Sequence, residues 1–242
     1  MRRSASPWML ILLLLAAFGQ GRAQEQGEKD PALAKAQDLL RQARTEISEF
    51  EKAGGKKSDP THPIAKWVEQ LWAMREQHPG TRAAALATSE AVHLLVHAER
   101  FADAQARADS VPPDDAAWES LTNYVMEAAT NQKDYSYAIR RLAALAQQQT
   151  DANLRAASQC HLARAHWRSG DTEAAKAGFR AVLDQAPDSP VAKAAESALH
   201  ELLNLGYGQP APAFSANTRA GAALSLADYR GRVALIVFWS ST

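Results

Sequence analysis

The sequence predicts a mainly α protein that ends in a short segment of α/β character. Three observations indicate this fold class. Apolar residues recur every three or four positions through most of the chain, as on the buried face of an amphipathic helix. A short pattern built around an alanine recurs at intervals of 34 and then 37 residues. The composition changes abruptly after residue 204, where glycine and proline precede a run of branched apolar residues.

The composition sets limits on the kind of partner. The chain has 242 residues, 46% of them hydrophobic, which is enough for a cleaved leader and one or two folded domains. Its 27 basic and 27 acidic residues cancel, so no overall field favours nucleic acid or an anionic membrane. We therefore expect protein or small-molecule partners and no nucleic acid.

Residues 1–23 have the layout of a secretory signal peptide. Arg2 and Arg3 precede an apolar run from Trp8 to Phe18, and small residues surround Ala23. As a helix this run of eleven residues would cover only ~16 Å, roughly half of a bilayer core. A permanent membrane anchor is thus the less favoured alternative. We expect cleavage after Ala23 and a secreted or periplasmic product.

Residues 24–60 are predicted to form an N-terminal helix and a linker. Asp30 can cap the helix, with Pro31 at its first position, and Gly54-Gly55 ends it. A coiled-coil dimer is the alternative, but the stripe is shorter than three heptads and favours packing on the following helices. The apolar stripe consists of Leu33, Ala36, Leu40, Ala43, Ile47 and Phe50.

Residues 61–204 are predicted to be a series of helices. The first begins near Pro63 and ends at His78-Pro79-Gly80, and Thr81 caps the next, which extends to about Ala98. A later helix is expected to open at Ser189-Pro190 and to run to about Leu203. The buried side of the first is expected to contain Ile64, Trp67, Val68, Leu71 and Trp72.

An internal repeat follows residue 98. Three short polar turns are each followed by an aromatic residue or threonine and then by an alanine, at Ala104, Ala138 and Ala175. A period near 34 residues with two helices per unit is the spacing of tetratricopeptide (TPR) repeats. The third copy resembles that family most closely, with Phe179 placed to fill the gap to the neighbouring helix pair and Asp171 placed as a helix cap.

The TPR-like resemblance covers roughly residues 81 to 204 and implies a concave surface that binds a peptide or protein. A structural spacer without a specific partner is the alternative that remains open.

Residues 205–242 differ in character from the rest. Ser225 and Asp228 have capping-box spacing, which predicts a single helical turn. The run from Val233 to Phe238 lacks alternation and is rich in branched residues, which predicts a central strand covered on both faces.

This segment is similar to the start of the redoxin families, the AhpC/TSA-type peroxiredoxins and the TlpA/ResA-type thiol-disulfide oxidoreductases. The matching marks are residues 208–214, 226–231 and 237–239, and the pair Phe238-Trp239 favours the TlpA/ResA type. The resemblance implies a thioredoxin-like domain in which the strand leads to a C-x-x-C motif at the start of a helix. The helix N-terminus would stabilise the attacking thiolate.

The sequence reaches Thr242 where the first cysteine of that motif is expected, and Cys160 is its only cysteine. The chain as given therefore cannot perform dithiol exchange, and we assign it no catalytic residue, no cofactor-binding residue and no metal ligand. Either it is a fragment of a longer reading frame, which we favour, or a natural truncation. With no neighbouring strands, the last ~35 residues are expected to be disordered or aggregation-prone.

The functional hypothesis is the N-terminal part of an exported thiol-disulfide oxidoreductase that acts on protein thiols or disulfides and needs no cofactor. Two alternatives stay open. One is a non-enzymatic TPR-like adaptor that binds a peptide or protein, and the other is a peroxiredoxin-type antioxidant protein.

A lone cysteine and two histidine pairs are the other candidate groups. Cys160 is interpreted as a packing residue, with a resolving or regulatory thiol as the alternative. His93 and His97 are four residues apart and could share a metal face, but without an evident third ligand we expect a solvated or groove-lining pair. His161 and His166 are five apart and are not expected to share a face.

Overall fold

The computed structural model describes residues 30–57, 59, 61–206 and 208–237. Helices make up most of these residues, so the mainly α prediction is confirmed. The chain divides into two compact units, and the boundary along the sequence lies between Arg100 and Phe101. The predicted signal peptide, the polar residues after it and the Phe238-Trp239 pair lie outside the described residues. None of the helices that are described is long and apolar enough to cross a membrane.

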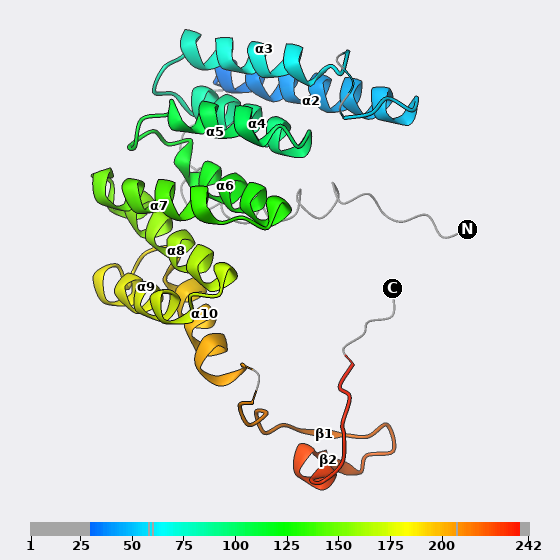
Figure 1. Cartoon of the computed structure of the whole chain (residues 1–242). Helices are drawn as coiled ribbons and strands as arrows, with labels where there is room; N and C mark the ends of the chain where they lie inside the picture. The colour runs from blue at the N-terminus through cyan, green and yellow to red at the C-terminus, as the bar shows by residue number, and fades with distance from the viewer. Residues whose placement is uncertain (1–29, 58, 60, 207, 238–242) are drawn as a thin grey trace. The chain divides into compact units, whose positions relative to one another are not determined.

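Among the described residues, the first unit contains the helices α2 (Pro31–Lys52), α3 (Ile64–Gln77) and α4 (Arg82–His97), and both α2 and α3 pack against α4 (Figure 1). The predicted caps are present: Asp30 Oδ1 accepts hydrogen bonds from the backbone N–H groups of Ala32 and Leu33. Thr81 Oγ1 accepts one from Ala84. These bonds satisfy amides that a helix leaves without partners, which is why the helices begin where the sequence predicts.

The predicted stripe of α2 is buried at Ala36, Leu40, Ala43 and Ile47, so packing on neighbouring helices is what covers it. One residue of α3 is wrongly predicted. Trp72 is only partly buried, and Met74 lies in the core instead. The reason is the helical period, because Met74 is three residues beyond the buried Leu71 whereas Trp72 is rotated about 100° away from it.

The second unit begins with six helices. From α6 onward, each helix packs on the next one along the chain, and α6 also packs on α8. Figure 1 shows α8, α9 and α10 side by side in the yellow to orange part of the chain. The helices are α5 (Phe101–Asp109), α6 (Trp118–Gln132), α7 (Ser136–Gln148), α8 (Ala152–Ser169), α9 (Thr172–Gln185) and α10 (Ala192–Asn204).

The repeated alanines occupy equivalent positions. Ala104, Ala138 and Ala175 each lie one turn into a helix that follows a polar turn, and all three are buried. Asp171 caps α9 as predicted, because its Oδ1 accepts a hydrogen bond from Ala174 N–H. The helix expected to open at Ser189-Pro190 starts later, since Ser189 N–H and Ala192 N–H bond into turns that precede α10.

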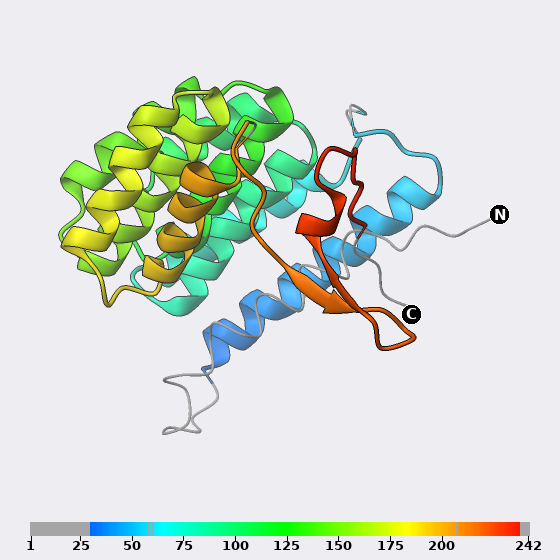
Figure 2. The same cartoon turned by 90° about the horizontal axis from the view of Figure 1, so that it is seen from below.

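The C-terminal segment forms a two-stranded antiparallel sheet, with β1 (Ser215–Asn217) paired to β2 (Ala223–Ser225), followed by the 3-10 turn η1 (Leu226–Tyr229) (Figure 2). The predicted helical turn is confirmed together with its capping box, in which Ser225 N–H donates to Asp228 Oδ2 at 2.8 Å.

The strand predicted for Val233–Phe238 is wrong over the residues described. Residues 233–237 have no regular secondary structure, and Val233 and Leu235 are 103% and 89% exposed. A strand is stabilised by hydrogen bonds to a neighbouring strand, and none of the described residues supplies that partner here.

The approach of α8 and α9 depends on one small residue, Gly178. A Cβ atom at this position would lie 2.7 Å from Ala163 Cβ. Because that distance is shorter than van der Waals contact, we expect Gly178→Val to lower the free energy of unfolding by about 1–3 kcal/mol. Chemical denaturation measures this loss. Gly206→Val is the control, since a Cβ at Gly206 meets no atom within 4 Å. Equal stability of the two variants would contradict the close approach.

Candidate functional site

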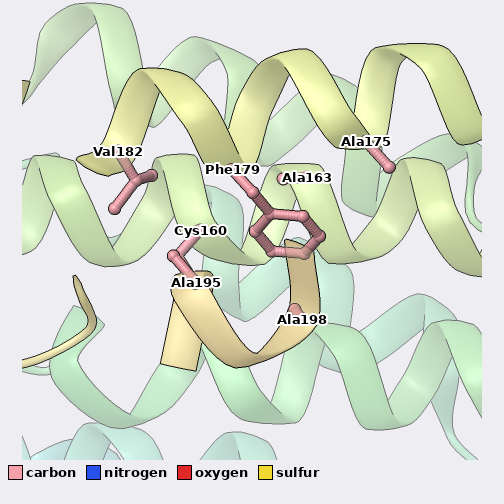
Figure 3. Packing of buried hydrophobic residues seen from close by; sticks show 7 residues of the cluster. All are labelled: Cys160, Ala163, Ala175, Phe179, Val182, Ala195 and Ala198. Carbon is pink, nitrogen blue, oxygen red and sulfur yellow. The ribbon is translucent and has the colours of Figure 1, made fainter. Parts of the chain in front are cut away.

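The only thiol of the chain lies in the core of the second unit. Cys160 projects from α8 and is 3% exposed. Figure 3 shows it beside the ring of Phe179 from α9, with Ala195 of α10 close to it. The cluster also contains Ala163, Ala175, Val182 and Ala198.

This setting opposes thiol chemistry. Burial raises the pKa of Cys160 above its ordinary value, and the charge of Arg164 offsets this only in part. A buried thiol with a raised pKa is a poor nucleophile, because the thiolate is the reactive form. The environment therefore fits the packing interpretation of Cys160.

We expect native Cys160 to react with a maleimide far more slowly than it does in urea at the same pH. In the folded chain, burial keeps the maleimide away from the Cys160 sulfur and disfavours its thiolate form. Unfolding removes both effects. Mass spectrometry of timed samples measures the two rates. A native rate equal to the rate in urea would show that this cysteine is accessible and available for redox chemistry.

The paired histidines of α4 face two different carboxylates. His93 Nδ1 lies 3.6 Å from Glu90 Oε2, which also accepts a hydrogen bond from Arg44 Nη2 at 3.0 Å. His97 Nε2 lies 3.4 Å from Glu51 Oε1, contributed by α2. His93 is buried, so the expectation of a solvated or groove-lining pair is wrong for this residue. The two histidines are covered because α2 packs on α4. The residue pattern of α4 alone does not predict this packing.

Glu90 is ionised despite its burial. Burial acts to raise the pKa of its carboxyl group, but the hydrogen bond with His93 and the charges of His93 and Arg44 outweigh that effect and bring the pKa below its ordinary value. The pair Arg44 and Glu90 thus joins α2 to α4 through a buried charge. Among the residues that the structure describes, no three His, Cys, Asp or Glu side chains are arranged to hold a metal ion.

Sequence reasoning missed His62, which lies in the connection between α2 and α3. Its ring is buried and packs edge-on against Phe50, with the ring centres 4.9 Å apart. Its Nδ1 accepts a hydrogen bond from Ile64 N–H at 3.2 Å, and its Nε2 lies 4.0 Å from Glu51 Oε1. We name Glu51, His62 and His97 together the Glu51 junction. No periodicity or motif relates these three positions, so only the fold brings them together.

His161 of α8 is partly buried, and its Nδ1 atom is shielded from solvent without a hydrogen-bond partner. Burial, with a smaller contribution from the charge of Arg164, lowers its pKa to about 4. His166 has different surroundings, because its Nδ1 lies 3.5 Å from Asp171 Oδ2.

The lowered pKa of His161 predicts an acid sensitivity of the second unit. Unfolding restores an ordinary pKa near 6.5, so the unfolded chain binds more protons between pH 6.5 and about 4. The contribution of neutral His161 to stability is complete above pH 6.5 and is lost as the pH falls toward 4. Denaturation of the wild type and of His161→Gln across this range measures it, and we expect the wild type to lose more stability. Parallel losses would contradict the prediction.

A shallow depression of about 550 Å³ lies between α2 and α3. Its charged groups are largely paired within the unit: Glu46 accepts hydrogen bonds from Lys66 Nζ at 2.8 Å and from Trp67 Nε1 at 2.9 Å. Glu49 and Gln70 line the same surface and are exposed. The depression offers polar and aromatic contacts, but its lining holds no cysteine, serine or histidine that could act as a nucleophile or base.

No protein-family model, curated protein or solved structure matches this chain.

Proposed function

We propose that this chain is the N-terminal part of an exported thiol-disulfide oxidoreductase, in which a TPR-like helical region precedes a thioredoxin-like domain. The single observation that supports it is the order of marks from Gly208 to Trp239, which is similar to the start of TlpA/ResA-type proteins. The short hairpin and the capped turn at Ser225 fit this proposal, because they are local elements that precede the apolar run.

The chain itself takes no catalytic part in this proposal. Dithiol exchange needs two thiols that can form a disulfide with each other, and the chain has only Cys160. The proposed role of residues 30–204 is to position a protein substrate or partner, while the reactive pair lies in sequence that follows Thr242. Protein thiols or disulfides are the proposed substrates, in a secreted or periplasmic location.

The coding sequence beyond Thr242 tests this proposal. A C-x-x-C motif within the first residues that follow, and reduction of insulin disulfides by the longer product, would support it. Replacement of both new cysteines by serine should abolish that activity, whereas Cys160→Ser should leave it unchanged because Cys160 is a packing residue. A stop codon directly after Thr242 would overturn the proposal. Peroxide reduction without disulfide reduction would favour the peroxiredoxin-type alternative.

The α2–α3 depression favours a second candidate function, a helical adaptor. Exposed Glu49 and Gln70 border a polar surface next to Trp67, as in a docking site for a peptide. A partner recovered from the exported protein fraction should be lost with Glu49→Lys/Gln70→Lys and retained with Lys193→Glu, an exposed control on α10. Retention of the partner by both variants would contradict binding at this depression.

A further inference from the structure

Two polar atoms of the Glu51 junction are shielded from solvent and have no hydrogen-bond partner among the described residues. They are Oε1 of Glu51, in the last turn of α2, and Nε2 of His62, in the connection between α2 and α3. They lie 4.0 Å apart, which is too long for a direct hydrogen bond. Buried polar atoms in folded proteins are nearly always hydrogen-bonded, because leaving one without a partner is unfavourable. The junction therefore calls for a further group that bonds to both atoms.

The hydrogen bond on the other side of the His62 ring decides what kind of group this is. Nδ1 accepts a bond from Ile64 N–H at 3.2 Å, so Nδ1 carries a lone pair and the ring proton lies on Nε2. Nε2 is then a donor, whereas Glu51 Oε1 is an acceptor. The group between them must accept a hydrogen bond from His62 and donate one to Glu51.

The separation of the two atoms limits the size of this group. An oxygen atom about 2.9 Å from both Nε2 and Oε1 forms two hydrogen bonds of ordinary length, with an angle of roughly 90° between them. A hydroxyl oxygen can accept one bond and donate the other, and water is the smallest molecule that does both. Buried water bound to otherwise unsatisfied polar atoms is a regular part of folded proteins.

We propose that the Glu51 junction binds one structural water molecule, which accepts a hydrogen bond from His62 Nε2–H and donates one to Glu51 Oε1. The water joins the last turn of α2 to the connection that leads into α3. His97 of α4 borders the same place, because its Nε2 lies 3.4 Å from Glu51 Oε1. This ring gives the water a third polar neighbour, and buried waters typically have about three.

Two other kinds of occupant fit the junction less well. A metal ion needs lone pairs from its ligands, and Nε2 of His62 has none to offer when it carries the ring proton. A lysine ammonium could donate to Glu51 but has no lone pair to accept the bond from His62. Lys57 of the linker lies 3.6 Å from Glu99 instead.

Nuclear magnetic resonance of the full chain tests the proposal. We expect the proton on His62 Nε2 to show a dipolar contact with water that tumbles with the protein. In rotating-frame spectra this contact has the opposite sign to proton exchange with bulk water, which keeps the two effects apart. A crystal structure of the full chain should place a water oxygen within about 3.2 Å of both atoms. A missing contact, or density in which either atom bonds to a protein group instead, would overturn the proposal.

Glu51→Met removes one of the two partners and keeps a side chain of similar length. We expect it to lose the water contact and to raise the equilibrium constant for unfolding about tenfold, because His62 Nε2–H is left without an acceptor. Glu49→Met is the matched control, since it removes an exposed carboxylate from the same helix. It should keep the contact and change the constant by less than about threefold. A water contact that persists in Glu51→Met, whatever its stability, would contradict the proposed site.

Discussion

Replacement of Phe179 by alanine is expected to lower the free energy of unfolding of the second unit by about 3–5 kcal/mol. The side chain is 0% exposed, and its ring points from α9 toward Ala195 and Ala198 of α10 (Figure 3). The ring of Trp167 also meets it edge-on, with centres 6.5 Å apart. The loss is large because the small side chains around the ring cannot move together to fill the cavity.

Urea unfolding followed by circular dichroism measures this loss. Phe214→Ala is the matched control, since Phe214 lies in the C-terminal segment and is 41% exposed, and its effect should stay within about 0.5 kcal/mol. A loss below about 1 kcal/mol for Phe179→Ala would mean that α10 does not depend on this ring. The control would then show whether the assay could resolve such a difference.

Replacement of Trp118 by alanine is expected to cost a similar amount, about 3–5 kcal/mol. Trp118 is 0% exposed, and its Nε1 donates to the carbonyl oxygen of Pro112 at 2.9 Å. The guanidinium of Arg141 lies 4.9 Å from the ring centre and bonds to the carbonyl oxygens of Ala108 and Val111. The indole is therefore the centre of an arrangement that ties α6 and α7 to the end of α5.

Trp118→Phe separates the two contributions of the indole. It keeps most of the ring and loses the bond to Pro112, so we expect a loss of about 1–2 kcal/mol, mostly from the carbonyl left without its donor. The same unfolding experiment measures both variants. Equal losses for alanine and phenylalanine would show that the hydrogen bond, and not the buried ring, carries the stabilisation.

The helices were predictable because their signals are local. Asp30, Thr81 and Asp171 bond to amides within three residues, and the repeated alanines follow the turn of a helix. The same holds for the capped turn at Ser225, whose partner Asp228 is three residues away. Such contacts depend on spacing along the chain, so they can be read from the order of residues alone.

The strand expected at Val233 shows the limit of this reasoning. An apolar run predicts what a segment would do if strands flanked it, but hydrogen bonds to those strands are not local. Where the described residues provide none, the run stays exposed and irregular. The thioredoxin-like assignment therefore continues to rest on the order of marks in the sequence.

Residue order along the chain was sufficient for the helices, their caps and the repeat, because each depends on contacts within a few residues. Tertiary structure alone decided that His62 and His97 meet Glu51, that Gly178 lies against Ala163, and that the thiol of Cys160 is enclosed by Phe179 and α10. The physical reason is that these contacts join helices whose relative rotation depends on the packing of whole faces. No spacing rule relates the residues that such packing brings together.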